Sequence, residues 1–293
     1  MMTSLERSIY ERKIEIAVQE AEALVERLAI RKAPIDPVMV AATERRILKL
    51  CPGNYKNAFD GRLEFLPKTR RFLCYYNTKY DRPGDDGHAP RTRFSLAHEL
   101  GHFFIDAHHE YLRAGGRVHP SQSEMLRSTP FEDQADAFAA HLLMPNRLFR
   151  PLANQDAVSI EMIADLAQTF RTSFVSTANR AIECTHFYCA VAAIRDGEIA
   201  WLRPGKPLIE KGIYPGPRGL VRSAAARSAC GAFQSGAREI LPSSGWGRDW
   251  FRIYDDDLSQ RLPVIESYLP APVMNTLIVL LTIPEDELED DDC

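Results

Sequence analysis

The fold is decided by one segment of the sequence, Phe94 to Asp106, which reads FSLAHELGHFFID. This segment contains His98 and His102, four residues apart, with Glu99 directly after the first histidine. Residues at positions i and i+4 lie on the same face of a helix, so the two imidazoles can converge on one tetrahedral metal ion. Glu99 lies beside that face, where its carboxylate could take a proton from a water molecule. The H-E-x-x-H pattern therefore predicts a catalytic metal site of the type found in metallopeptidases.

The residues around this pattern distinguish a metal site from the alternative, a solvent-exposed helix with two surface histidines. Apolar side chains surround the predicted helix on nearly every side, and they are Phe94, Leu96, Ala97, Leu100, Phe103, Phe104 and Ile105. Such a helix is expected to be buried, and burying histidine and glutamate side chains without partners is energetically costly. Because a metal ion would be such a partner, we favour the metal site over the surface helix.

A third ligand is expected from the segment FEDQADAFAAHLLMP, Phe131 to Pro145, which also has the pattern of a helix. Its Glu132 and Asp136 are again four residues apart and therefore share one face. We expect Glu132 to bind the metal and Asp136 to accept the ring N–H of a ligating histidine. The alternative is that the carboxylate of Glu132 only stabilises the start of the helix by interacting with the positive end of the helix dipole. This alternative does not explain the presence of Asp136, which lies further along the helix. Asp133 is a competing carboxylate, to which we prefer Glu132.

Together the two motifs resemble the ImmA/IrrE family of metallopeptidases, in which an H-E-L-G-H helix pairs with an E-x-x-A-[N/D]-x-F-A-A-x-L-L-M-P helix. The resemblance covers about Arg70 to Pro145 of this sequence. It implies that His98, His102 and Glu132 bind zinc in a gluzincin-like site and that Glu99 is the catalytic base. Histidine and carboxylate ligands also accept Mn2+ or another divalent ion, so the sequence does not fix the metal.

The resemblance also implies a substrate. It points to an endopeptidase that cleaves a helix-turn-helix (XRE-type) transcriptional repressor in response to stress or to a mobile genetic element. The alternative is a regulatory DNA- or protein-binding module that contains a metal and has no turnover. Glu99 counts against this alternative, because a purely structural metal site needs no base beside its ligands. A further alternative is an intact site that the chain itself blocks until a partner or ligand releases it.

Several other residues are candidates for contacts with the substrate or with the oxyanion that forms during peptide hydrolysis. His108, His109 and His119 lie in or near the segment between the two motif helices, and each could supply a hydrogen-bond donor. Tyr76 is on the strand expected before the first motif helix, where a zincin-type peptidase can bind its substrate by β-addition. The alternatives are surface histidines and a tyrosine that only packs.

The composition excludes some classes of protein. The chain has 293 residues, of which 45% are hydrophobic and 26% charged, as is ordinary for a soluble globular protein. A net charge of -4 argues against a surface that binds nucleic acid throughout, although a local basic patch is compatible with it. No apolar run approaches the roughly 20 residues that span a bilayer, and the charged N-terminus lacks the pattern of a signal peptide. We therefore expect a cytoplasmic protein without membrane contact, whose six cysteines are free thiols.

The order of the patterns predicts an α+β fold in four parts. Residues 1–150 are expected to form a mainly helical, zincin-like metallopeptidase domain with a small β-sheet. Residues 151–186 should form a helix-turn-helix-like segment. Residues 187–284 are expected to form a mixed α/β domain for sensing or interaction. The resemblance to longer family members suggests that this domain is GAF-like. Residues 285–293 are expected to be a disordered acidic tail.

Three local patterns give sharper predictions. Residues 36–50 have the pattern of a single helix, ended by the residues CPGN. Asp196 and Gly197 lie between two apolar runs, which predicts a β-hairpin. Residues 173–183 would be the recognition helix of a DNA-binding segment, but Arg180 is their only arginine. Direct DNA binding is therefore weakly supported, and we prefer a helical pair that only packs.

Overall fold

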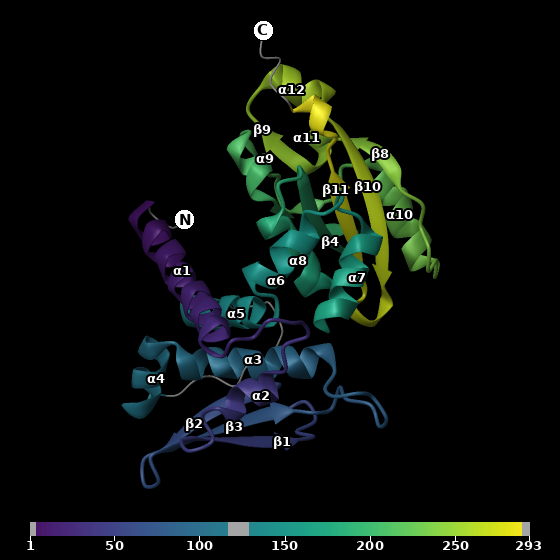
Figure 1. Ribbon diagram of the computed structural model, residues 1–293. Coiled ribbons are helices and arrows are strands. Elements are labelled where there is room, and N and C mark those ends of the chain that lie inside the picture. The colour runs from purple at the N-terminus through teal and green to yellow at the C-terminus, as the bar shows by residue number, and fades with distance from the viewer. Residues whose placement is uncertain (1–3, 117–128, 289–293) are drawn as a thin grey trace. The chain divides into compact units, whose positions relative to one another are not determined.

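The computed structural model describes residues 4–116 and 129–288 of the chain (Figure 1). The architecture is α+β, as the sequence predicts. The chain divides into two compact units, of which the first comprises Met1–Phe149 and Ala167–Ser173. The second unit comprises Arg150–Leu166 and Phe174–Cys293, so residues 151–186 are shared between the two units. None of the helices in the described ranges has the length and apolar character needed to cross a membrane.

The first unit contains a small sheet and the helices that pack with it. Its helices are α1 (Ser4–Arg27), α2 (Pro37–Ala42), α3 (Pro90–Phe104), α4 (Asp106–Arg113) and α5 (Pro130–Leu143), and its strands are β1 (Leu48–Gly53), β2 (Gly61–Leu66) and β3 (Arg71–Asn77). Helices α6 (Asn146–Ala153) and α7 (Ile160–Phe170) are shared with the second unit. The strand order is β1-β3-β2, with β1 parallel and β2 antiparallel to β3. Strand β3 is therefore paired on both sides, whereas β1 and β2 lie at the two edges.

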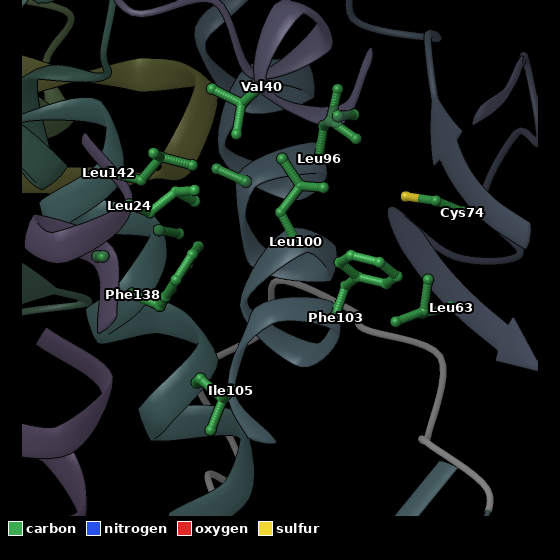
Figure 2. Close-up of a cluster of buried hydrophobic side chains, with 14 of the residues drawn as sticks. Leu24, Val40, Leu63, Cys74, Leu96, Leu100, Phe103, Ile105, Phe138 and Leu142 are labelled. Carbon is green, nitrogen blue, oxygen red and sulfur yellow. The ribbon is translucent and has the colours of Figure 1, made fainter. Parts of the chain in front are cut away.

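Helix α3 lies at the centre of the first unit, and its side chains are buried on almost every side (Figure 2). On one side it packs against the sheet, which contributes Leu63 of β2 and Cys74 of β3. On the other side it packs with α1 and α5, which contribute Leu24 and Phe138. This burial confirms what the apolar surroundings of the H-E-x-x-H pattern predict, and it excludes a solvent-exposed helix.

A glycine allows α3 and α5 to approach each other closely. A Cβ atom at Gly101 would lie 3.1 Å from the Cα of Ala135 and 3.2 Å from the Cβ of Phe138. These facing atoms belong to the α5 backbone or sit directly on it, so they cannot move aside without moving the helix. The glycine of the first motif and the small residue of the second therefore set the distance between the two motif helices.

Residues 36–50 differ from their prediction. The structure has a short helix, α2, which Asp36 caps by accepting a hydrogen bond from the backbone N–H of Val38. Strand β1 follows and begins at Leu48, which is buried and pairs with Phe72 of β3. The prediction of one continuous helix is wrong because pairing with a distant strand competes with local helix propensity, and periodicity does not report that pairing.

The second unit is built around an antiparallel sheet. Its described elements, besides parts of α6 and α7, are α8 (Phe174–Cys184), β4 (Cys189–Arg195), β5 (Glu198–Pro204), α9 (Lys206–Glu210), β6 (Ile213–Pro215), β7 (Gly219–Leu220), α10 (Ala224–Gln234), β8 (Ser243–Trp246), α11 (Gly247–Trp250), β9 (Phe251–Ile253), α12 (Asp256–Arg261), β10 (Pro263–Ala271), η1 (Pro272–Met274), β11 (Thr276–Thr282) and η2 (Glu285–Glu287). The main sheet has the order β7-β5-β4-β11-β10-β8, and a separate pair joins β6 to β9. Asp196 and Gly197 turn from β4 into β5 with φ angles of 53° and 79°, which confirms the predicted hairpin.

The acidic end of the chain departs in part from its prediction. Glu285–Glu287 form a 3-10 helix, and Leu288 is buried in the core of the second unit. The prediction of a disordered tail from residue 285 is wrong for these residues, because the apolar side chain of Leu288 has a core to pack against. Residues 289–293 lie outside the described residues.

Candidate metal centre

Three side chains from the two motif helices converge in the first unit. His98 and His102 come from α3 and Glu132 comes from α5, and one ligand atom of each lies within 4.8 Å of the others. His98 Nε2 is 3.2 Å from His102 Nε2 and 3.1 Å from Glu132 Oε2. His102 Nε2 is 3.7 Å from Glu132 Oε1. The two histidines are buried and the glutamate is partly exposed, so the group has one side open to solvent.

The start of helix α5 determines where Glu132 lies. Thr129 caps the helix by accepting a hydrogen bond from the backbone N–H of Glu132, and Pro130 occupies the first helical position. Glu132 is thus in the first turn, as the dipole alternative also requires, yet its carboxylate is turned toward the histidines. The competing carboxylate, Asp133, accepts a hydrogen bond from the hydroxyl of Tyr10 in α1 at 2.9 Å. The geometry therefore selects Glu132 over Asp133.

Asp136 holds the outer nitrogen of His98. Its Oδ1 is 2.7 Å from His98 Nδ1, and because a carboxylate only accepts, Nδ1 must carry the hydrogen. The Nε2 lone pair of a neutral His98 then faces the other two side chains. Burial disfavours the charged form of His98, but the hydrogen bonds to Asp136 and Glu132 outweigh burial and raise its pKa to about 10 in the metal-free protein.

The donor set of this group fits a divalent cation. Burial would raise the pKa of Glu132, but the neighbouring His102 and His98 hold it well below its usual range, so Glu132 is a carboxylate. Two imidazole nitrogens and a carboxylate oxygen at this spacing repel one another unless a proton or a cation lies among them. Zinc takes these ligand types in tetrahedral sites that leave one position open. The residues present therefore fit a metal ion, whose identity the donor set alone does not fix.

Glu99 lies beside this group in a fully buried position on α3. Its negative charge helps to raise the pKa of His98, and, after burial, the pKa of the Cys74 thiol. The backbone of β2 approaches this carboxylate at Gly61, where an added Cβ atom would overlap the carboxylate of Glu99. Sequence reasoning missed Gly61, although a glycine at the start of a strand is the signal of such a close approach.

His108 does not lie where an oxyanion donor would be needed. It is fully buried on α4, and its Nδ1 is 3.0 Å from His102 Nδ1, the nitrogen that faces away from the ligand group. Its Nε2 is 3.3 Å from Gln134 Oε1, and its ring stacks on Phe131 with centroids 3.5 Å apart. Burial, and then the nearby His102, lower the pKa of His108 to about 4. The structure thus places His108 behind the ligand rather than above it.

Of the other two candidate histidines, the described one, His109, is bonded to the backbone rather than to the group. His109 Nδ1 is 2.8 Å from the carbonyl oxygen of Phe103, and its ring packs against Phe72 and Phe103. These contacts hold the partly buried ring of His109 against the core, with Nδ1 bonded to the backbone. His119 lies outside the described residues.

Tyr76 lies on β3 opposite Gly61, and its hydroxyl faces another histidine, His88. Its hydroxyl is 3.3 Å from His88 Nε2, and burial, followed by the nearby Cys74, raises its pKa to about 12. Because Tyr76 belongs to β3, which is paired on both sides, this strand cannot accept an added strand. Among the described strands of this sheet, β1 and β2 each have an edge that could do so, and β2 is the one that adjoins Glu99 at Gly61.

The comparisons with known proteins bear on the same residues. Residues 85–181 match the IrrE N-terminal-like domain of peptidase family M78, and this range contains His98, Glu99, His102 and Glu132. This domain belongs to the ImmA/IrrE family of metallopeptidases. The match to this domain confirms the resemblance to the ImmA/IrrE family that the two motifs indicate. No curated protein matches the sequence significantly.

A solved structure has a fold similar to that of this chain. It is a Mycobacterium tuberculosis transcriptional regulator, with 13% sequence identity and a TM-score of 0.57. The alignment covers 95% of this chain and 79% of that chain. At this identity the likeness shows a common fold and nothing about activity.

Proposed function

We propose that this chain is a zinc-dependent endopeptidase that cleaves a helix-turn-helix transcriptional repressor. The observation that carries the proposal is the convergence of His98, His102 and Glu132 beside the buried Glu99, within an ImmA/IrrE metallopeptidase domain. A purely structural metal site would have no use for a carboxylate in the position of Glu99. The two motifs come from different helices, and their convergence therefore goes beyond what either motif indicates alone.

The chemistry follows from the roles of these side chains. A divalent ion bound to His98, His102 and Glu132 would lower the pKa of a water molecule and polarise a peptide carbonyl. Glu99 would accept a proton from the attacking water on a carboxylate oxygen and return it to the leaving amine nitrogen. Asp136 keeps the proton of His98 on Nδ1, so that Nε2 remains available as a ligand.

The edge strand β2 is suited to hold the substrate. An extended peptide can pair with the backbone of a free strand edge, and this binds main chain without requiring a particular sequence. Strand β2 begins at Gly61, which adjoins Glu99, so a peptide paired with this edge would lie near the proposed base. This role replaces the one that the sequence suggests for Tyr76 on β3.

The choice of a repressor as substrate rests on the family resemblance. It is also compatible with the named role of the structural neighbour as a transcriptional regulator, although that likeness shows the fold alone.

We further propose that the first unit has a zincin-like fold. The antiparallel sheet of the second unit, with helices such as α8 and α10, supports a GAF-like sensor domain. Regulation of cleavage by such a domain would suit a peptidase of narrow specificity.

Cleavage assays with a matched pair of proteins test the chemistry. Zinc-loaded wild-type protein and Glu99→Gln are each mixed with candidate repressors, and fragments are identified by mass spectrometry. Glutamine retains the shape of the side chain but cannot act as a base. We expect the wild type to cleave and Glu99→Gln to bind the same amount of zinc without cleaving. Equal cleavage by the two proteins would refute the proposed base.

A second candidate function is a regulatory DNA-binding module that contains a metal and has no turnover. The observation that favours it is the helical pair α7 and α8, which lies in the segment that the sequence predicts to be helix-turn-helix-like. Arg180, the arginine of the second helix, counts against it because only 2% of its surface is exposed and it pairs with Glu183. Binding to duplex DNA with a steep dependence on salt concentration would support this candidate, and its absence would exclude it.

A further inference from the structure

A chain of hydrogen-bonding groups runs from His102 to the backbone of α1. His102 Nδ1 is 3.0 Å from His108 Nδ1, and His108 Nε2 is 3.3 Å from Gln134 Oε1. Gln134 Nε2 donates in turn to the carbonyl oxygen of Lys13 at 3.0 Å. The chain therefore links α3, α4, α5 and α1 in one line. His102 and His108 are fully buried, and Gln134 is 7% exposed.

The last link fixes the direction of all the others. Because the Lys13 carbonyl can only accept, the amide nitrogen of Gln134 faces it and the amide oxygen faces His108. His108 must then donate from Nε2, and its neutral ring has only one N–H, so its Nδ1 accepts. His102 therefore carries its hydrogen on Nδ1 and presents the Nε2 lone pair to His98 and Glu132.

We propose that His108 and Gln134 are positioning residues that fix the tautomer of His102 and tie it to the backbone of α1. The inference rests on the proposed function in one respect, namely that the group binds a metal ion. The two histidine ligands are then oriented by different kinds of hydrogen-bonding partner. His98 is oriented by the carboxylate of Asp136, whose side chain is 57% exposed. His102 is oriented inside the core by the neutral groups of His108 and Gln134.

Packing restrains the same ring. Phe131 stacks on His108, and its ring centroid is 5.2 Å from that of His102 with an interplanar angle of 22°. Phe131 directly precedes Glu132, so one helix start supplies a ligand, a stacking ring and, at Gln134, the acceptor for His108. The second motif helix thus orients His102 as well as contributing a ligand.

Substitution of His108 tests the proposal through metal affinity. His108→Phe keeps a ring against Phe131 but removes the acceptor for His102. We expect its Zn2+ dissociation constant, measured by chelator competition, to rise roughly 10–100-fold. His108→Asn places an amide oxygen near the position of Nδ1 and should restore much of the affinity. The matched control is His109→Phe, the neighbouring residue of the same helix, whose ring nitrogen is bonded to a backbone carbonyl.

A spectroscopic signature separates positioning from general stability. In wild-type protein, nitrogen-15 spectra of the imidazoles should place the hydrogen of His108 on Nε2 and that of His102 on Nδ1. The Co2+ absorption spectrum should change in His108→Phe and stay unchanged in His109→Phe. Thermal unfolding of the metal-free variants identifies any variant that fails to fold, and Gln134→Leu then provides a second route to break the chain.

The outcomes distinguish the two proposals. If the wild type binds Zn2+ and His108→Phe and Gln134→Leu bind it equally well, the positioning role is refuted and the proposed function is untouched. The opposite hydrogen placement on His108 in the nitrogen-15 spectra would also refute it. If wild-type protein has no measurable affinity for Zn2+ or Co2+, both proposals fail together.

Discussion

Histidine side chains in this chain take their roles from the atoms that face their ring nitrogens. His98 faces the carboxylate of Asp136, His102 faces the ring of His108, and His109 faces a backbone carbonyl. The sequence singles out the two ligands because a spacing of four residues places them on one helix face. It could not assign the other two, because the turn between α3 and α4 decides which side of α4 faces the site.

The raised pKa of His98 predicts how the stability of the metal-free protein depends on pH. Its pKa is about 10 against an ordinary value of 6.5, so the folded state binds this proton more tightly than the unfolded state does. The resulting stabilisation is fully present below about pH 6.5 and is lost as the pH rises through about 10. The unfolding midpoint of chelator-treated protein should therefore fall over this range.

Asp136→Asn is the matched variant, because it removes the charge that holds the proton on His98 and keeps the size of the side chain. Its unfolding midpoint should fall less steeply with rising pH than that of the wild type. A metal ion must displace the same proton, so the Zn2+ affinity of the wild type should rise with pH. Identical pH profiles for the two proteins would show that His98 does not carry the effect.

Gly61 predicts a separation between metal binding and catalysis. Gly61→Ala would push the carboxylate of Glu99 aside without touching His98, His102 or Glu132. We expect kcat to fall roughly 100-fold, as misplacement of a catalytic group by about 1 Å can cause, while the Zn2+ dissociation constant stays unchanged. Peptide cleavage and chelator competition on the same preparation measure the two quantities. Unchanged cleavage would mean that Glu99 tolerates the displacement or is not the base.

At the scale of elements, the contact between α3 and α5 makes the site. Replacing glycine by alanine inside a helix normally stabilises a protein by about 0.5–1 kcal/mol. At Gly101 the sign should reverse, because the new Cβ would press on the backbone of Ala135. We expect Gly101→Ala to lower the free energy of unfolding by roughly 1–3 kcal/mol and to weaken Zn2+ binding as Glu132 moves away.

Gly231 provides the control for this prediction, since it lies inside helix α10 and an added Cβ would meet nothing within 4 Å. Gly231→Ala should therefore stabilise the protein and leave Zn2+ binding unchanged. Thermal unfolding and chelator competition on the two variants make the comparison. If Gly101→Ala is as stabilising as Gly231→Ala, close packing of the motif helices does not position the ligands.

Elements were predictable where their pattern was local. Helix α3 could be predicted from its H-E-x-x-H spacing and the apolar residues around it, and the hairpin at Asp196 and Gly197 from its turn residues. Strand β1 could not be predicted, because it is stabilised by parallel pairing with β3, which follows only after a long connection. The close approach of Gly61 to Glu99 was hidden for the same reason, since it depends on how the sheet packs on α3.

At the scale of the whole molecule, the division of the chain does not follow the order of the sequence. Residues 167–173 belong to the first unit, although residues 150–166 belong to the second. One of their contacts is with Arg93, which is 4% exposed and donates to the carbonyl oxygens of Phe170 and Arg171. Composition shifts along the sequence suggest a boundary near residue 150. They give no sign that residues 167–173 belong to the first unit again.

Because residues 167–173 belong to the first unit, we expect its smallest stable fragment to include them. In a fragment of residues 1–150 the Arg93 guanidinium keeps Ile35 as an acceptor and loses the carbonyls of Phe170 and Arg171. We expect this loss to cost roughly 1–3 kcal/mol. A fragment of residues 1–173 keeps all three acceptors and should unfold at a higher temperature. Arg93→Met separates this cause from lost packing: it should destabilise the longer fragment and leave the shorter one unchanged or more stable. Equal destabilisation of both fragments would mean that residues 167–173 stabilise the unit through packing alone.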